Sequence, residues 1–353
     1  MMLKASYVPY RLDFNFKALT SRGALPYKDT YFIKVWNPDN PDKFGIGECA
    51  LFRGLSAEDN DDYEVALRQL CRCINNGAKY DVSDRSSIMF GLETAIADYQ
   101  NGCVRTPFPS DFSKGNGCVT INGLVWMGSV KEMAQRAEAK IESGFRCVKF
   151  KVGGQDFEQE FKLLERIREN HPPKNLEIRL DANGAFTKDN ALERIKRLSQ
   201  LVIHSIEQPV LPGQWDLMAH ICAESPIPIA LDEELIGCRP MTDKHNMLRH
   251  IRPAYLILKP ALCGGFSGAD EWIEAAECHN IGWWATSALE SNVGLNAIAQ
   301  WVAAKTVTMP QGLGTGSLYN NNIASPLCLD GELLKIAIEN KWSFPEFKWI
   351  TTE

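Results

Sequence analysis

Charged residues recur at a nearly constant interval through the middle of the chain. They are Lys151, Asp181, Glu207, Asp232 and Lys259, and each stands at the end of an apolar stretch typical of a buried strand. The successive intervals are 30, 26, 25 and 27 residues, which is the length of one strand, loop and helix. If these strands are neighbours in a parallel barrel, their carboxyl ends share one mouth, so we expect the five charges to converge there.

One member of this set alone carries little information, because an Asp after an apolar run more often starts a helix or a turn. Asp181 is ambiguous for this reason. Glu207 is harder to explain, since Glu is a poor helix cap and Pro209 prevents an immediate helix. Two glutamates follow Asp232, and only Asp232 continues the strand-end pattern. The periodicity of the whole set favours a functional site.

Lys149 adds a second lysine to the same strand as Lys151. Residues two apart in a strand share a face, and neither face of a parallel barrel strand offers bulk water. Buried ammonium groups are costly unless carboxylates or a function compensate them. Lys259, which precedes Pro260, presents the same problem elsewhere in the barrel.

Three carboxylates, Asp181, Glu207 and Asp232, make an oxygen-only site that suits Mg2+, with Mn2+ as the expected substitute. Such a cation accepts both oxygens of a substrate carboxylate and stabilises the enediolate formed when the adjacent carbon loses its proton. A lysine crowded by other cations should have a lowered pKa and act as a neutral base. The pattern therefore predicts metal-dependent proton removal next to a carboxylate.

The elements that position these residues alternate between strand and helix. Eight strands are predicted at 118–123, 147–151, 176–181, 202–207, 227–232, 255–259, 283–287 and 311–313, with helices between them that include 129–143, 155–170, 188–200 and 268–280. This number and order favour a TIM-type (β/α) barrel over an open sheet. No glycine-rich nucleotide motif is present.

The first hundred residues follow a different pattern. Segments 3–14, 30–37 and 44–50 predict an antiparallel meander. A helix is expected from Ser56, whose following residues are acidic, and a second helix over 86–100. We expect a small α+β domain ahead of the barrel.

The composition limits the partners of this chain. Its 353 residues are 45% hydrophobic and 23% charged, and no apolar run approaches the roughly 18 residues of a membrane span. The net charge of −6 provides no basic stripe for nucleic acid. Eleven scattered cysteines and the lack of a signal-like N-terminus indicate a reducing, cytoplasmic location. A small-molecule substrate remains, and the oligomeric state stays open.

The order Lys149-x-Lys151, Asp181-x-Asn183, Glu207, Asp232, Lys259 resembles the enolase superfamily, specifically its muconate-lactonizing subgroup. Members of that superfamily pair a Lys or His base with Mg2+. The resemblance spans the chain and implies an α+β capping domain over residues 1–115, a (β/α) barrel over 116–325, and a C-terminal segment, 326–353, that packs back on the cap. It also implies a mobile cap loop at about residues 17–29, including Arg22, that closes over the barrel mouth.

Three further segments resemble the o-succinylbenzoate synthase family within that subgroup. They are Ile121–Leu124, Thr286–Asn292 and Gly312–Gly316. The resemblance implies dehydration of 2-succinyl-6-hydroxy-2,4-cyclohexadiene-1-carboxylate, a dicarboxylate, to 2-succinylbenzoate in menaquinone biosynthesis.

The resemblance also implies roles for individual residues. Lys151 would remove the α-proton and then protonate the leaving hydroxyl, Lys259 would stabilise the enediolate, and Lys149 would hold Lys151. The expected substrate-binding residues are Arg22, Asn183, Ser287, Gly314 and Thr315. Ser287 could equally be the N-cap of the following helix, and the glycine-rich run could be a plain turn.

Two alternatives stay open. An N-succinylamino acid racemase would use Lys151 and Lys259 as opposed acid/bases on the same metal. A non-catalytic barrel that serves as a binding or scaffold protein would use the strand-end charges as an ion-pair network. The lack of a histidine at the end of the seventh strand argues against a mandelate-racemase type of base, and the lack of Asp-x-Asp after the eighth argues against dipeptide epimerases.

Overall fold

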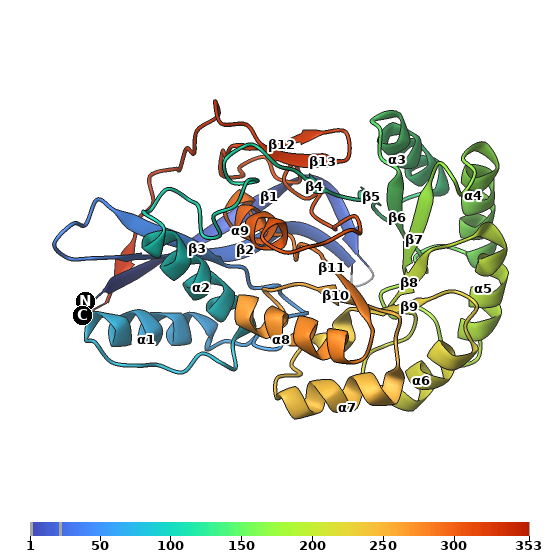
Figure 1. Ribbon diagram of the computed structural model, residues 1–353, viewed down its shortest axis with the longest axis horizontal. Coiled ribbons are helices and arrows are strands. Elements are labelled where there is room, and N and C mark those ends of the chain that lie inside the picture. The colour runs from blue at the N-terminus through green and yellow to red at the C-terminus, as the bar shows by residue number, and fades with distance from the viewer. Residues whose placement is uncertain (1–2, 21–22, 353) are drawn as a thin grey trace.

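Two parts make up the molecule, a curled parallel sheet wrapped by helices and an antiparallel sheet backed by two helices (Figure 1). The structure is a computed structural model and describes residues 3–20 and 23–352. The two parts lie side by side, with the capping domain over one side of the barrel. This is the α/β fold class predicted from the sequence, a (β/α) barrel with an α+β cap.

The parallel sheet contains seven strands in the order β11-β10-β9-β8-β7-β6-β5. They are β5 (Gly123–Val125), β6 (Cys147–Lys151), β7 (Glu177–Asp181), β8 (Ser205–Glu207), β9 (Ile229–Leu231), β10 (Tyr255–Leu258) and β11 (Gly282–Ala285). The predicted eighth strand at 311–313 is instead a short extended segment. It joins the two edges of the sheet by isolated parallel bridges, Gln311 to Ile121 and Gly312 to Thr286.

The first predicted barrel strand, 118–123, is split between two sheets. Its first half, β4 (Val119–Thr120), pairs with β13 (Leu333–Ile336), which also pairs with β12 (Leu327–Asp330). The parallel pairing with β6 begins only at Gly123. The predicted barrel strand therefore began too early. Its first residues pair with β13, from near the end of the chain, and not with β6.

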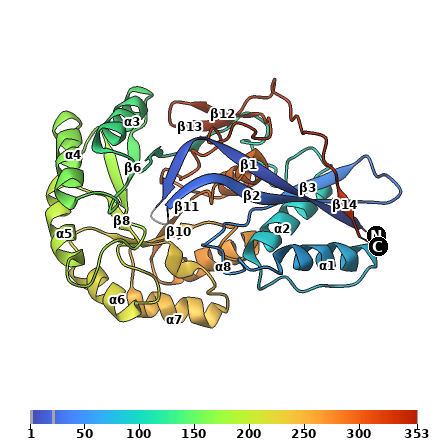
Figure 2. The same ribbon diagram turned by 180° about the vertical axis from the view of Figure 1, so that it is seen from behind.

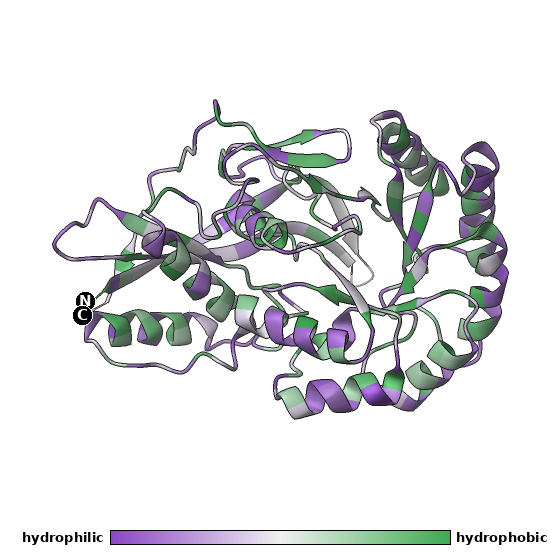
Figure 3. Cartoon of the chain, in the orientation of Figure 1, coloured by the Kyte–Doolittle hydropathy of each residue, from purple (hydrophilic) through white to green (hydrophobic). Residues whose placement is uncertain are grey.

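Helices cover the outside of the barrel. They are α3 (Val130–Glu142), α4 (Phe157–Asn170), α5 (Ala191–Leu198) with the short η1 (Ser199–Leu201), α6 (Trp215–Glu224), α7 (Met241–Ile251), α8 (Gly265–Cys278) and α9 (Asn292–Ala303). The short helix η2 (Glu233–Leu235) instead follows the end of β9 and is buried. Hydrophilic residues colour the outer faces of α4 and α7, and apolar residues line the strands (Figure 3). The start of α3 shows how the sequence fixes these helices, since Ser129 and Glu132 form a capping box.

The capping domain is an antiparallel sheet with the order β14-β1-β2-β3. Its elements are β1 (Lys4–Thr20), β2 (Gly23–Trp36), β3 (Phe44–Cys49), α1 (Tyr63–Asn75) and α2 (Ser86–Gln100), and the tail adds β14 (Ile350–Thr351). The tail strand pairs with β1 through Ser6 and Tyr7. The first and last strands of the described chain are therefore neighbours in the sheet of the capping domain.

The helix predicted to begin at Ser56 begins at Tyr63 instead. Ser56 closes a turn by accepting a hydrogen bond from the Phe52 amide (3.0 Å), and Glu58 accepts from the amide of Ser87 (2.7 Å). These polar side chains therefore serve a turn and a tertiary contact. Their local pattern is the same as that of a helix start, which explains the error.

The segment 17–29, predicted as a loop, belongs to a β-hairpin in its described part. β1 and β2 pair as far as Thr20 and Gly23, with a shift of register between Asp13 and Ala18. The hairpin reaches the barrel side of the molecule (Figure 2), where the amide of Asn15 donates to the carbonyl of Leu318 (2.9 Å). Arg22 lies outside the described residues.

The cap depends on two glycines of β3 that let the strand lie directly on α2. A Cβ at Gly47 would overlap the carbonyl of Gly91, so backbone would have to move. We expect Gly47→Ala to lower the free energy of unfolding by about 3 kcal/mol or more. Gly54→Ala, at a site with open space but a φ of +74°, should cost only about 1 to 2 kcal/mol. Urea unfolding followed by circular dichroism measures both, and equal losses would contradict the packing argument.

Candidate active site

The charged residues of the sequence pattern lie together at one end of the barrel. β6, β7 and β8 end at Lys151, Asp181 and Glu207, while Asp232 and Lys259 come one residue after β9 and β10. Lys151 lies opposite Asp181 in the sheet register, and Asp181 lies opposite Glu207. Backbone pairing alone therefore brings these side chains to the same level.

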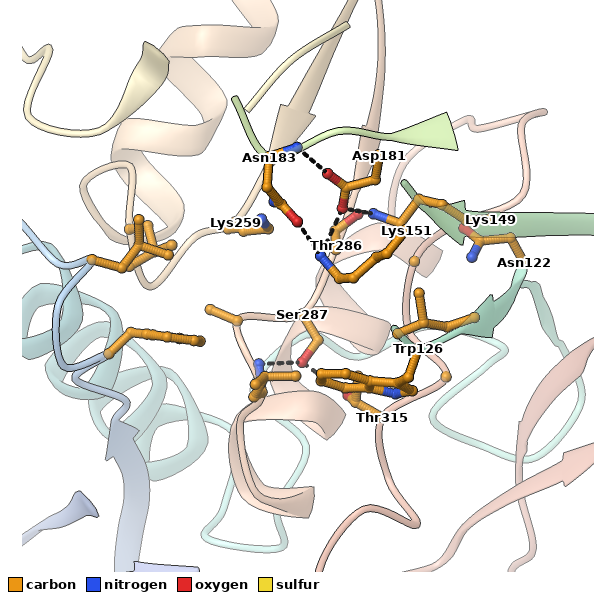
Figure 4. A pocket seen from close by; sticks show the side chains of 18 of the residues that line it. Asn122, Trp126, Lys149, Lys151, Asp181, Asn183, Lys259, Thr286, Ser287 and Thr315 are labelled. Carbon is orange, nitrogen blue, oxygen red and sulfur yellow. Dashed lines mark hydrogen bonds and ion pairs between the residues drawn. The ribbon is translucent and has the colours of Figure 1, made fainter. Parts of the chain in front are cut away.

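A pocket opens above these strand ends, between the barrel and the cap. Its empty volume, including the part open to solvent, is about 770 Å³. The cap contributes Phe52 and Leu55, and further apolar wall comes from Leu124, Trp126 and Leu262. Its polar lining consists of Asn122, Lys149, Lys151, Asp181, Asn183, Glu233, Lys259, Thr286, Ser287 and Thr315. In Figure 4, Lys151 and Lys259 approach the cavity from different sides.

Each of the three carboxylates faces a lysine. Lys149 Nζ lies 2.8 Å from Glu207 and 3.4 Å from Asp181, and Lys151 Nζ lies 2.9 Å from Asp181. Lys259 pairs with Asp232. All three carboxylates are at most 2% exposed. The three lysines act as internal counterions for this buried cluster.

The lysines do not fully offset the effect of burial on two of the three carboxylates. Burial and the neighbouring Asp181 raise the pKa of Glu207 to about 8, despite Lys149. Burial also raises the pKa of Asp232. Burial opposes the ionisation of Asp181, but Lys151 and Lys149 outweigh it and hold that pKa well below its usual value. One buried carboxylate oxygen, Oε1 of Glu207, has no hydrogen-bond partner.

These features fit a divalent cation. Within residues 3–20 and 23–352, no three His, Cys, Asp or Glu side chains are placed closely enough to hold a metal ion as they stand. The carboxylates are turned to their lysines instead. The donor set itself, three buried carboxylates with an unpartnered oxygen, is the hard-oxygen chemistry that Mg2+ requires. Asp181, Glu207 and Asp232 are the residues that would hold it.

Carboxylates raise the pKa of two of the three lysines. For Lys259, burial lowers the pKa, but Asp232, Glu207 and further carboxylates outweigh it, so the pKa is raised. Lys149 follows the same pattern through Glu207 and Asp181. The depressed lysine pKa expected from the sequence is therefore not found at these two positions.

Asn183, predicted to bind substrate, bonds within the protein. Its side-chain oxygen accepts from Lys151 Nζ (2.6 Å), and its side-chain nitrogen donates to Glu233 (3.0 Å). Its own amide donates to Asp181 (3.1 Å), in a left-handed backbone conformation (φ 44°) that Asn tolerates. Asn183 thus orients Lys151. Glu233 was passed over in the sequence because it stands next to the in-register Asp232.

The pocket lining includes three further residues that were predicted to bind substrate, Ser287, Gly314 and Thr315. The hydroxyl groups of Ser287 and Thr315 already form hydrogen bonds within the protein. Thr315 donates to Ser287 (2.8 Å), and Ser287 bonds to Glu290. The alternative reading of Ser287 as the N-cap of α9 is wrong, because Ser291 holds that position and accepts from Val293. The apolar walls, including Trp126, were missed since single apolar residues in loops carry no periodic signal.

Comparison with known proteins agrees with this geometry. Residues 132–325 match the family described as enolase C-terminal domain-like. An o-succinylbenzoate synthase of Desulfotalea psychrophila is 44% identical to this chain, over 95% of this chain and 99% of that protein. The chain therefore belongs to the enolase superfamily. Within that superfamily, its sequence similarity over nearly the full length is to an o-succinylbenzoate synthase.

Solved structures show the same fold. The crystal structure of MenC from Desulfotalea psychrophila superimposes with a TM-score of 0.84 at 40% identity, over 95% of this chain and 100% of that one. A dipeptide epimerase from Cytophaga hutchinsonii, complexed with Mg and D-Ala-L-Val, superimposes over the full length of both chains with a TM-score of 0.83 at 17% identity. That second likeness concerns the fold alone.

Removing one carboxylate tests the metal site directly. Glu207→Gln should abolish Mg2+ binding measured by calorimetry, because it removes a charged oxygen ligand. The thermal midpoint without metal should change little, since relief of repulsion from Asp181 and Asp232 offsets the lost pair with Lys149. Glu234→Gln, a buried Glu bonded to Gln208 and Gly213, is the matched control and should keep Mg2+ binding. Retained binding in Glu207→Gln would refute the assignment.

Proposed function

We propose that this protein is an o-succinylbenzoate synthase that dehydrates 2-succinyl-6-hydroxy-2,4-cyclohexadiene-1-carboxylate to 2-succinylbenzoate, a step of menaquinone biosynthesis. The observation that carries the proposal is the pair Lys151 and Lys259, which reach one apolar-walled pocket from β6 and from the end of β10, on either side of three carboxylates. The full-length similarity to the Desulfotalea enzyme supports it.

Lys151 moves the proton in this proposal. Its ammonium group is held at 2.6 Å by Asn183 and at 2.9 Å by Asp181, so its position is fixed before substrate arrives. As a free amine it takes the proton from the carbon next to the ring carboxylate. It then gives that proton to the hydroxyl leaving from the same face, and water and the aromatic ring result. One residue is sufficient for this syn elimination.

The carboxylates have a separate task. A divalent cation held by Asp181, Glu207 and Asp232, which we propose is Mg2+ with Mn2+ as a substitute, would supply the positive charge that stabilises an enediolate. The three side chains are positioned for this by the register of β7 and β8 and by the residue after β9. The cap adds the apolar side chains of Phe52 and Leu55 to the pocket wall, which disfavours water at this end.

The surroundings of Lys259 suit a fixed cation that stabilises negative charge on the substrate. Burial lowers its pKa, but its partner Asp232 and the nearby Glu207 raise it by more. A racemase needs a second lysine that alternates between acid and base. An N-succinyl-L-Arg/Lys racemase of Bacillus cereus is 30% identical but aligns with only 47% of this chain.

The walls of the pocket fit a cyclic substrate. Aromatic and aliphatic walls, including Trp126 and Leu262, complement a ring better than a charged amino-acid side chain. A purely structural ion-pair network would not require such a pocket.

None of the helices in the described ranges has the length and apolarity to cross a membrane. Eleven unpaired cysteines support our proposal of a cytoplasmic location.

Substitution of the two lysines separates their roles. Lys151→Ala removes the proton carrier, so turnover and solvent-deuterium exchange at the substrate α-carbon should both stop. Lys259→Ala removes only charge stabilisation and should retain about a hundredth to a thousandth of the rate. Lys259→Arg keeps the charge without the geometry and should fall between. If each alanine variant instead blocks one stereochemical direction of exchange on an N-succinylamino acid, racemisation is the better description.

Metal removal tests the reaction class. Treatment with excess chelator should abolish formation of 2-succinylbenzoate, since the enediolate then lacks its principal stabilising charge. Addition of Mg2+ or Mn2+ should restore it, while the circular dichroism spectrum stays constant because the lysines neutralise the carboxylates in the meantime. Full activity in chelator would exclude a metal-dependent mechanism.

A further inference from the structure

Leu289 lies in the pocket wall with a strained backbone. Its φ is +63°, in the left-handed region that a bulky residue adopts only at an energetic cost. It belongs to the loop between β11 and α9, which also contributes Ser287 and Ala288 to the pocket. Strained residues of this kind persist only where the surrounding structure holds them.

Three hydrogen bonds hold the peptide groups of Leu289. Its amide donates to the hydroxyl of Ser287 (3.0 Å). Its carbonyl accepts from the hydroxyl of Tyr319 (2.7 Å) and from Lys28 Nζ (2.9 Å), and Lys28 also donates to the carbonyl of Ala288 (2.6 Å). Lys28 is part of β2, so the cap holds a segment of the barrel that is about 260 residues distant in sequence.

Lys28 is an unusual donor because it is a buried cation without a direct carboxylate partner. It is 6% exposed and takes part in none of the ion pairs found among the described residues. Burial lowers its pKa, and the charges of Glu290 and Glu48, which face it, oppose this. A methionine would fill the same space without that electrostatic cost. The lysine also places Nζ 5.6 Å from the centre of the Phe52 ring, and it supplies hydrogen-bond donors for two carbonyls, which methionine cannot do.

A second contact from the cap holds the other end of the loop. Glu48, in β3, accepts from the amides of Ser291 and Gly294 at 3.0 Å each, at the start of α9. Thr30, next but one to Lys28 on β2, donates to the same carboxylate (2.9 Å). The segment 288–294, which covers the end of the loop and the first turn of α9, is therefore held to the cap at both ends.

We propose that Lys28 is a positioning residue, which clamps Leu289 in its strained conformation and thereby sets the affinity of the pocket for its ligand. Lys28 does not reach the reacting atoms and has no part in proton transfer. The identity of that ligand rests on the proposed function, whereas the clamp itself does not.

The clamp is tested in two ways with Lys28→Met. In the ligand-free protein, hydrogen exchange in peptides covering residues 286–291 should be faster by about tenfold, the factor that corresponds to about 1.4 kcal/mol. With substrate, KM should rise by a similar factor while kcat changes much less, because Lys151 and Lys259 stay in place. Tyr319→Phe removes the other donor to the same carbonyl and should act in the same direction.

Lys34→Met is the matched control. Lys34 is on the same strand and packs on the rings of Trp36, Phe44 and Trp349, away from the pocket. It should leave both measurements unchanged. The proposal is overturned if Lys28→Met resembles Lys34→Met, or if it accelerates exchange equally over the whole chain, which would indicate a merely structural role. If the wild-type protein does not turn over the substrate, the proposed function fails, and the exchange result still decides the clamp.

Discussion

The constraint on which the structure depends is the repulsion among three carboxylates at the ends of adjacent strands. At most 2% of each side chain is exposed, so water screens their charges poorly. Lysines from β6 and from the end of β10 reduce this repulsion, while burial and the remaining repulsion from Asp181 raise the pKa of Glu207. A cation bound there would reduce the remaining repulsion among the carboxylates. The strand register brings the carboxylates together, and the buried lysines and the need for a cover over the site follow from that cluster.

Sequence analysis recovers the part of the site that backbone geometry dictates. Lys151, Asp181 and Glu207 could be placed together because parallel pairing brings strand ends to one level whatever the neighbouring side chains are. The alternation of strands and helices identified the barrel for the same reason. The pattern extends over more than one hundred residues, so chance agreement at a single position has little influence.

What sequence analysis missed depends on contacts between distant segments. Asn183 lines the pocket, and its hydrogen bonds to Lys151 and Glu233 are contacts that no local pattern specifies. Ser56 has the local pattern of a helix start but closes a turn. The donors of Lys28 are used by carbonyls some 260 positions along the chain. In each case the tertiary environment decides among several hydrogen bonds that the residue could make.

The closure of the barrel has an evolutionary consequence. Only two isolated bridges, at Gln311 and Gly312, join the last barrel segment to its neighbours in the described chain, so no long ladder fixes its register. Gly314 and Thr315, which follow directly, form part of the pocket wall. Insertions or deletions after this closing segment can change the shape of the pocket wall without shifting the strands that carry the lysines and the carboxylates. Substrate preference in a superfamily can diversify at such a closing segment. Selection can alter the residues that contact the ligand there while the catalytic residues on the other strands are retained.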